Sequence, residues 1–327
     1  MLVTAVVVPD AFNATRFADP AYHLNTEMFL RGIDSNGLIL VDAEERLYNE
    51  LCDKVDPLAG LGKGKNTHAL FEELLKKRRQ KVLRFVKTGC SVNNSRSTAD
   101  VATQVVNHCR ADALLVDSES QPALSTSAEA EIAVIPVPDY SSSRFEDERR
   151  RCCERLPPVD QMSVGRFDDL ISRCTRYSRW LRLYDKQIGK GNSLSHFRRG
   201  IERILGLWTT AAYYPRSELH AEIFTVVDES AYASFSPDVA YRRVKNDIVD
   251  VLATTFGLRI DLHFKQDNRS ICHARHLQTQ CLAISFDSGF DFVEEDGTLR
   301  RNFIKIDGGC LEHLQEYRQL PEYRPSR

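Results

Sequence analysis

The sequence predicts an α/β protein built from two domains. Short apolar runs rich in β-branched residues alternate with longer helical segments, which is the pattern of a parallel sheet connected by helices. The pattern stops at residues 141–160, where the chain becomes Ser-rich and then strongly charged, and a second α/β pattern follows. A chain of 327 residues is also longer than a single hydrophobic core usually supports. We therefore expect a first domain over 1–140, a linker over 141–160 and a second domain over 161–327.

The first domain opens with an apolar run, LVTAVVV, that is typical of a strand buried on both faces of a parallel sheet. The predicted strands of this domain are Leu2–Val8, Leu38–Val41, Val82–Val86, Ala113–Val116 and Ile132–Val137. The predicted helices are Ala21–Arg31, Ala43–Lys54, Asn66–Gln80 and Thr98–Arg110. Because strands and helices alternate, we expect helices on both faces of the sheet.

The second domain repeats the alternation with less regular spacing. Its predicted strands are Trp180–Tyr184, Leu219–Val227, Leu258–Phe264, Cys281–Phe286 and Asn302–Ile306. Its predicted helices are Leu194–Leu207 and Val239–Phe256. We therefore expect a second α/β unit rather than an all-helical or all-strand domain.

Composition is that of an ordinary globular protein, with 42% hydrophobic and 28% charged residues. No apolar run approaches the roughly 20 residues of a membrane-spanning helix, and the N-terminus lacks the pattern of a signal peptide. We therefore expect a cytoplasmic protein without membrane insertion. The nine cysteines include no C-x-x-C pair, which predicts reduced thiols rather than a zinc site or a disulfide framework. The net charge is −2, and neither half of the chain has the strongly basic balance of a protein that coats nucleic acid by charge alone.

Four carboxylates, Asp10, Glu50, Asp100 and Asp117, are the candidate catalytic and metal-binding groups. Asp10 and Asp117 follow apolar strands, and sites in open parallel sheets form outside the carboxyl ends of strands. Carboxylates that gather there repel one another, and Mg²⁺ or Mn²⁺ relieves this repulsion through oxygen ligands. A metal held in this way can activate water for attack on a phosphodiester. The alternatives are a helix cap for Asp100 and a solvated helix carboxylate for Glu50.

The order of these motifs resembles that of a PIN-like nuclease domain. The matching stretches are VVVPDAFNAT, GLILVDAEERLYNEL, the Gly-rich GLGKGKN and STADVATQVVNHCRADALLVDSES. The resemblance implies that the four carboxylates bind the metal ion and that Asn13 acts as the polar residue soon after the first Asp. It also implies nuclease activity, with an endoribonuclease favoured over a deoxyribonuclease. Ala11 and Phe12, which separate Asp10 from Asn13, depart from the commonest pattern of the family.

Two lysines, Lys63 and Lys65, lie in the glycine-containing loop GLGKGK. As nucleic-acid-binding residues they would hold phosphates along a single-stranded backbone. The alternative is that they are ordinary solvated lysines near a helix end. The loop does not satisfy the P-loop pattern G-x-x-x-x-G-K-[ST].

His273 and Arg275 of the second domain form an H-x-R motif, which invites comparison with H-x-K phosphodiesterases. The stretches LYDKQIG, HFRRGIERIL, HARHLQT and ISFDSGFDF resemble the phospholipase-D-like domain at the C-terminus of MIT-domain proteins. The resemblance implies a pocket formed by Asp185, His273, Arg275 and Asp287. Arg275 replaces the expected Lys, and Gln280 stands where the Asp of the signature would fall. We therefore expect a binding surface rather than an enzyme. The alternative is that His273 or Arg275 has an ordinary structural partner, such as Asp185 or Asp287.

The leading interpretation is a metal-dependent nuclease whose first domain cuts nucleic acid, RNA being favoured. The second domain would recognise the substrate, a partner protein or a second copy of the chain. The resemblance also implies that, in bacteria, such two-part chains with a PIN-like and a phospholipase-D-like domain fit toxins or phage-defence effectors. The alternative is a non-catalytic binding or regulatory protein whose carboxylates are structural and whose second domain docks partners.

Overall fold

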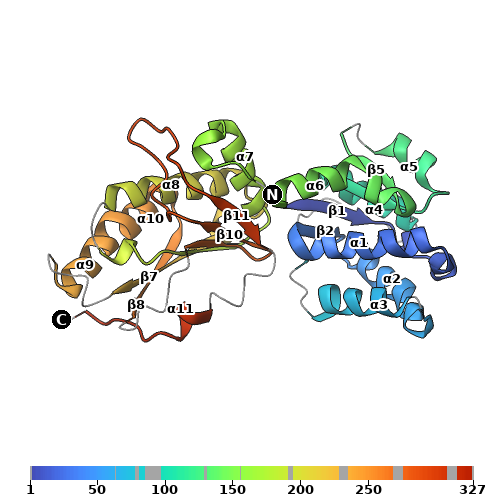
Figure 1. The fold of residues 1–327 in the computed structure, drawn as a ribbon, viewed down its shortest axis with the longest axis horizontal. Coiled ribbons are helices and arrows are strands. Elements are labelled where there is room, and N and C mark those ends of the chain that lie inside the picture. Colours follow the sequence, from blue (N-terminus) through green and yellow to red (C-terminus); the bar gives the residue numbers. More distant parts are fainter. Residues whose placement is uncertain are drawn as a thin grey trace. The chain divides into compact units, whose positions relative to one another are not determined.

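The computed structural model describes residues 2–62, 64–77, 81–84, 97–128, 131–154, 156–190, 194–227, 235–267, 275–307 and 315–325. They form two compact units, which meet in the sequence between Cys152 and Cys153 (Figure 1). We call Leu2–Cys152 the N-terminal unit and Cys153–Arg327 the C-terminal unit. Each unit has its own sheet and its own buried core.

The N-terminal unit is built on a parallel sheet of five strands in the order β3-β2-β1-β4-β5. The strands are β1 (Val3–Val7), β2 (Gly37–Val41), β3 (Val82–Arg84), β4 (Ala113–Val116) and β5 (Ala133–Pro136). The central strand β1 is buried at every position, which is why its sequence is apolar without alternation. The predicted parallel α/β sheet is confirmed.

Helices connect these strands and cover both faces of the sheet. They are α1 (Pro20–Asn36), α2 (Arg46–Val55), α3 (Lys65–Phe71), α4 (Thr98–Cys109) and α5 (Gln121–Ser127), and α3 continues into the wider helical turn η4 (Glu72–Lys77). Single turns of tighter helix are η1 (Pro9–Ala11), η2 (Ala14–Ala18) and η3 (Asp56–Gly60). α1 packs with α3, whereas α4 packs with α5 and crosses β1, β2 and β4. Right-handed connections that run in opposite directions along the sheet place these two pairs on opposite faces.

The segment 141–160, expected to be a linker, is mostly helical. It contains the end of η5 (Val137–Ser142), then α6 (Arg144–Glu154) and η6 (Val159–Gln161). Glu146 of α6 is 1% exposed, accepts a hydrogen bond from the Tyr140 hydroxyl at 2.6 Å and pairs with Arg149 at 2.6 Å. α6 is therefore tied into the N-terminal unit, because its charged sequence contains the partners that neutralise a buried carboxylate.

The C-terminal unit is built on a mixed sheet of six strands in the order β11-β10-β9-β6-β7-β8. The strands are β6 (Trp180–Tyr184), β7 (His220–Val227), β8 (Arg259–Gln266), β9 (His276–Gln278), β10 (Ala283–Phe286) and β11 (Ile304–Asp307). β6, β7 and β8 pair in parallel, whereas β9, β10 and β11 form an antiparallel ribbon on the other side of β6. The second α/β pattern is confirmed. The structure also contains β9, a strand that the sequence did not predict.

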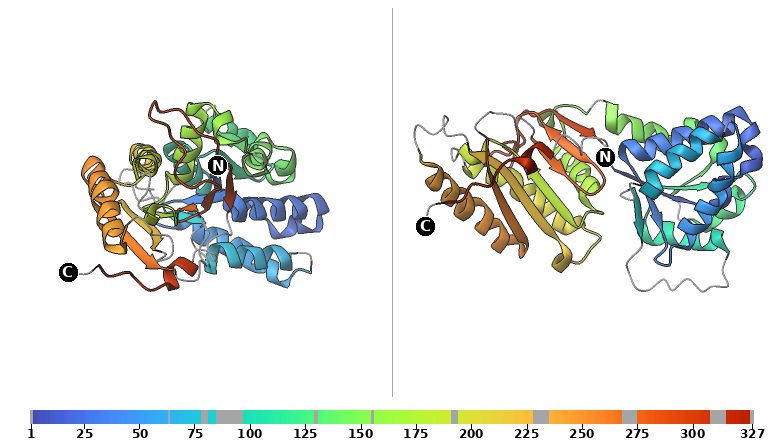
Figure 2. Two further views of the ribbon diagram at one scale, coloured as in Figure 1. Left: turned by 60° about the vertical axis from the view of Figure 1, so that its left-hand side comes forward. Right: turned by 90° about the horizontal axis from the view of Figure 1, so that it is seen from below.

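The two faces of this sheet differ in character. The helices α7 (Val164–Thr175), α8 (Leu194–Ala211), α9 (Pro237–Val244), η10 (Lys245–Asp250) and α10 (Val251–Phe256) cover one face (Figures 1 and 2). The short helix α11 (Gln315–Gln319) lies on the other, where Tyr317 packs on Tyr184 with ring centroids 5.3 Å apart. Tyr184 and Arg182 alternate with the buried Leu181 and Leu183, so the face bearing α11 is the more polar one. The remaining short turns are η7 (Ile188–Lys190) and η8 (Arg216–Glu218).

Two further expectations concern membranes and thiols. Among the described residues, none of the helices combines the length and apolar character that crossing a membrane requires. Four cysteines with described side chains are free, namely Cys52, Cys109, Cys174 and Cys281, and all but the first are buried.

Candidate functional site

Asp10 and Asp117 lie at the ends of neighbouring strands in the N-terminal unit. The backbone N–H of Val8 donates to the carbonyl of Leu115 at 2.9 Å, so β1 and β4 end at the same level. Asp10 follows in η1, and Asp117 directly follows β4. The sheet therefore brings both carboxylates to its carboxyl edge, where sites form in open parallel sheets.

Asp10 and Glu50 lie within electrostatic reach of each other, and each has a cation from α2. Lys54 Nζ lies 2.6 Å from Asp10 Oδ1, and Arg46 Nε lies 2.8 Å from Glu50 Oε1. Glu50 also accepts a hydrogen bond from the hydroxyl of Thr98, the first residue of α4. Burial opposes ionisation of Glu50, but the bonds from Thr98 and Arg46 outweigh it and lower the pKa, whereas the charge of Asp10 raises it. The structure therefore brings Asp10 and Glu50 near each other.

Asp117 is largely buried and faces Arg16 of η2. Arg16 Nη1 lies 2.7 Å from Asp117 Oδ1, and Arg16 Nη2 lies 2.8 Å from Glu119 Oε1. The contact with Asp117 is an ion pair without the geometry of a hydrogen bond, so the buried Oδ1 atom has no hydrogen-bond donor. Because this oxygen is buried and in contact with Arg16, a further ligand could reach it only if Arg16 moved.

Asp100 has the capping role that the sequence left open. Its Oδ2 accepts from the backbone N–H of Ser97 at 3.2 Å and from the Ser97 hydroxyl at 2.8 Å. The Ser97 oxygen in turn accepts from the Asp100 N–H at 3.2 Å, which completes a reciprocal cap of α4. The carboxylate of Asp100 is thus engaged at the helix start, two residues beyond the Thr98 that contacts Glu50.

A carboxylate that the sequence interpretation passed over, Asp42, also ends a strand at this edge. It follows β2, is 1% exposed and accepts hydrogen bonds from the backbone N–H groups of Arg46 at 2.9 Å and Leu47 at 2.7 Å. Both of its oxygens cap α2. The signal that could have found it is its position in GLILVD, directly after an apolar run.

The predicted nucleic-acid-binding residues are placed differently from one another. The Asn13 side chain accepts from the backbone N–H of Thr15 at 3.0 Å and so caps η2. Lys65 is exposed at the start of α3. Lys63 lies outside the described residues. Asn13 therefore has a local structural role, and Lys65 remains available to solvent and ligands.

A second group of metal-type ligands is formed by Asp56, His68 and Glu72, whose donor atoms lie within 4.8 Å of one another. Lys76 Nζ lies 2.9 Å from Asp56 Oδ1 and 2.5 Å from Glu72 Oε1. These hydrogen bonds raise the pKa of Lys76, so the lysine stays protonated. Its ammonium group supplies the positive charge that a metal ion would otherwise bring.

In the C-terminal unit, Asp185 is buried directly after β6 and holds the turn that contains Gly289. Its Oδ1 accepts from the N–H of Gln187 at 2.8 Å and its Oδ2 from the N–H of Phe290 at 3.1 Å. Burial raises the pKa of Asp185 to about 6, although these hydrogen bonds and the charge of Arg275 act in the opposite direction. Asp185 thus has a structural role, and the predicted His273 lies outside the described residues.

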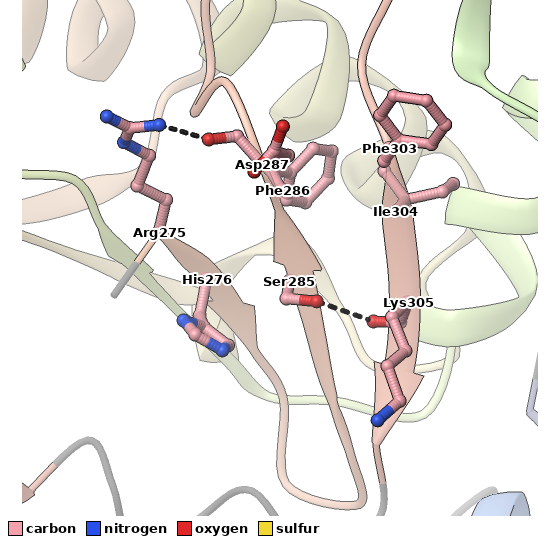
Figure 3. A pocket seen from close by; sticks show the side chains of 8 residues that line it. All are labelled: Arg275, His276, Ser285, Phe286, Asp287, Phe303, Ile304 and Lys305. Carbon is pink, nitrogen blue, oxygen red and sulfur yellow. Dashed lines mark hydrogen bonds between the residues drawn. The ribbon is translucent and has the colours of Figure 1, made fainter. Parts of the chain in front are cut away.

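A hollow of about 530 Å³ lies on the antiparallel ribbon of the same unit (Figure 3). We call it the β9–β11 hollow and define it by Arg275, His276, Ser285, Asp287, Phe303 and Lys305. It brings the predicted Arg275 and Asp287 together, because Arg275 Nη1 donates a hydrogen bond to the backbone carbonyl of Asp287. The other four residues were missed, since only the register of the strands shows that they share a site.

No protein-family model, curated protein or solved structure matches this chain. Its function is therefore inferred from its own residues and their geometry.

Proposed function

We propose that the chain is a metal-dependent nuclease, in which the N-terminal unit cuts and the C-terminal unit recognises the substrate. One observation carries the proposal: Asp10 and Asp117 follow adjacent parallel strands at the same edge of the sheet, and Glu50 lies within electrostatic reach of Asp10. Carboxylates at one edge of a sheet supply the hard oxygen ligands that Mg²⁺ and Mn²⁺ prefer.

The donor set fits a divalent cation. The buried Asp117 Oδ1 lacks a hydrogen-bond donor, and the Asp10 side chain is 62% exposed and so within reach of solvent. Oxygen atoms of this kind would hold the ion, together with Glu50. When bound, such an ion lowers the pKa of a coordinated water and supplies a nucleophile for phosphodiester hydrolysis.

The cations that pair with these carboxylates would bind phosphate once a metal ion is present. Lys54 and Arg16 neutralise Asp10 and Asp117, and a divalent ion would take over that role. Both side chains could then contact phosphate, as could the exposed Lys65. Phosphate contacts of this type bind any nucleic-acid backbone and weaken as salt rises. RNA is the favoured substrate because the first 140 residues resemble PIN-like nucleases.

A second candidate function is favoured by the same ion pairs. Asp10, Glu50 and Asp117 each have a cation from the protein within 2.8 Å. Carboxylates neutralised in this way are stable without a metal, and structural ion pairs of this kind are common. The chain would then be a regulatory protein that docks partners through its C-terminal unit.

Cleavage of labelled single-stranded RNA and DNA, with Mn²⁺ or with EDTA, separates the two functions. We expect cleavage that EDTA stops and that Asp10→Asn and Asp117→Asn each abolish, because an amide keeps the shape of the side chain but loses its charge. Asp147→Asn is the matched control, since Asp147 is exposed on α6, whose Arg149 contacts Asn36 at the opposite edge of the sheet. Near wild-type cleavage by either site variant would show that the cluster is wrongly assigned. Absence of cleavage with either metal would favour the regulatory function.

A further inference from the structure

Three directly paired residues form a polar row across the antiparallel ribbon of the C-terminal unit. Lys305 on β11 pairs with Ser285 on β10, which pairs with His276 on β9. Directly paired residues point to the same face of a sheet, and Figure 3 shows these three side chains on one side of the strands. The row forms the floor of the β9–β11 hollow.

On the β6 side of His276, the row is covered by other side chains. His276 pairs with Tyr184 on β6, and Tyr184 pairs with Phe224 on β7, with the two rings stacked at 4.6 Å. Tyr317 of α11 packs on Tyr184 and is fully buried. The C-terminal segment therefore covers the aromatic part of the row and leaves the part from His276 to Lys305 accessible.

The hollow contains positive charge that is only partly neutralised. Lys305 is exposed, and within the described ranges it forms no hydrogen bond or ion pair through its side chain. Arg275 uses Nη1 to reach the Asp287 carbonyl, but its buried Nε atom has no hydrogen-bond partner. Because Nε is enclosed by the protein, a ligand in the hollow would contact the guanidinium through its Nη atoms. The buried Asp185 interacts electrostatically with Arg275, and among the described residues Asp287 is the one carboxylate that lines the hollow beside Arg275 and Lys305.

An exposed aromatic ring lies beside these cations. Phe303 lines the hollow, is 49% exposed and has the guanidinium of Arg301 5.4 Å from its ring centroid. Its carbonyl accepts from the Asp287 N–H at 3.0 Å, which places the ring next to the Asp287 position. An exposed ring among cations is the arrangement on which the bases of single-stranded nucleic acids stack. Inorganic phosphate or a lipid headgroup would use the cations but not the ring.

We propose that the β9–β11 hollow binds single-stranded nucleic acid, with one backbone phosphate held by Lys305, another held by Arg275 on the opposite side of the hollow, and a base stacked on Phe303 (Figure 3). The Asp287 carboxylate accepts a hydrogen bond from an exocyclic amino group of a base, a pairing that carboxylates make in nucleic-acid recognition. A volume of about 530 Å³ is in the range of pockets that enclose small ligands, so it suits a nucleotide or two of a flexible strand. The inference rests on the proposed function, because it identifies where the C-terminal unit holds the substrate.

Fluorescence anisotropy with short labelled single-stranded RNA and DNA, in EDTA to prevent cleavage, tests the proposal on the full chain. We expect Phe303→Ala and Lys305→Glu each to weaken binding about tenfold. Lys305→Glu should also reduce the dependence of affinity on salt, by about one unit of slope. The matched controls are Val164→Ala and Arg166→Glu, which change exposed residues of α7 and should leave affinity unchanged.

The outcomes separate this inference from the nuclease proposal. Wild-type affinity in both hollow variants would overturn the inference, and so would binding of phosphatidylserine vesicles or inorganic phosphate but of neither polynucleotide. Cleavage that depends on Asp10, combined with unchanged binding in the hollow variants, would overturn the inference alone. Binding that depends on Phe303 and Lys305 without any metal-dependent cleavage would overturn the nuclease proposal alone. The RNA and DNA arms identify which polynucleotide binds.

Discussion

The carboxylate of Asp185 occupies the space that a side chain at position 289 would need. Gly289 has φ of +74°, and a Cβ atom there would lie 2.0 Å from Asp185 Oδ2. The same oxygen accepts the hydrogen bond from the N–H of Phe290 at 3.1 Å. The turn after β10 therefore closes directly onto the buried acid, and it does so only because the residue has no side chain.

Gly289→Ala should lower the free energy of unfolding of the C-terminal unit by about 3 kcal/mol. About half of this comes from the left-handed backbone, and the rest from displacement of Asp185 and loss of its hydrogen bond. Gly297→Ala is the matched control, because Gly297 has φ of +82° but nothing within 4 Å of its Cβ position. It should cost only the backbone part. Denaturation followed by tryptophan fluorescence measures both, since the two tryptophans, Trp180 and Trp208, lie in this unit. Equal losses would contradict the contact between residues 185 and 289.

A pH dependence of stability follows from the same buried acid. Burial raises the pKa of Asp185 from 3.8 to about 6, so between these values the folded unit binds a proton that the unfolded chain releases. Its stabilising contribution is therefore fully present below about pH 4 and is lost as the pH rises through 6. A change of about two pKa units corresponds to about 3 kcal/mol.

The measurement is the difference in unfolding free energy between the wild type and Asp185→Asn at several pH values. The amide does not titrate, and the other groups contribute equally to both proteins. The wild type should lose about 3 kcal/mol relative to the variant from pH 4 to pH 7. A difference that stays constant with pH would show that Asp185 titrates normally.

The fold could be predicted from sequence wherever burial on both faces leaves a continuous apolar run. β1 and β4 are such strands, and their predicted positions agree with the structure to within a residue. β9 could not be predicted, because His276–Gln278 contains a single apolar residue and pairs only through contacts distant in sequence. α6 was missed because its charges suggested a linker, whereas one of them, Glu146, is buried with its partners.

The candidate site shows the same limit at the level of single residues. Asp10, Asp42 and Asp117 give the same signal in the sequence, an acid after an apolar run, but Asp42 uses both oxygens to cap a helix. Strand position predicts where a carboxylate lies and not which hydrogen bonds it makes. The β9–β11 hollow was only partly predictable, because its members come together through strand register and through the cover that Tyr317 provides next to them.

Asp100 either caps α4 or binds a metal ion. The two roles can be distinguished because Ser97, its partner in the cap, can be mutated separately. The reciprocal bonds with Ser97 predict that Asp100→Ala and Ser97→Ala each destabilise the N-terminal unit by about 1 kcal/mol, since each removes one half of the cap of α4. Thermal unfolding followed by circular dichroism measures this loss. If Asp100 only caps the helix, the two variants should also cleave RNA at similar rates, each well above that of Asp10→Asn. Loss of cleavage in Asp100→Ala with activity retained in Ser97→Ala would instead make Asp100 a metal ligand, as the resemblance to PIN-like nucleases implies.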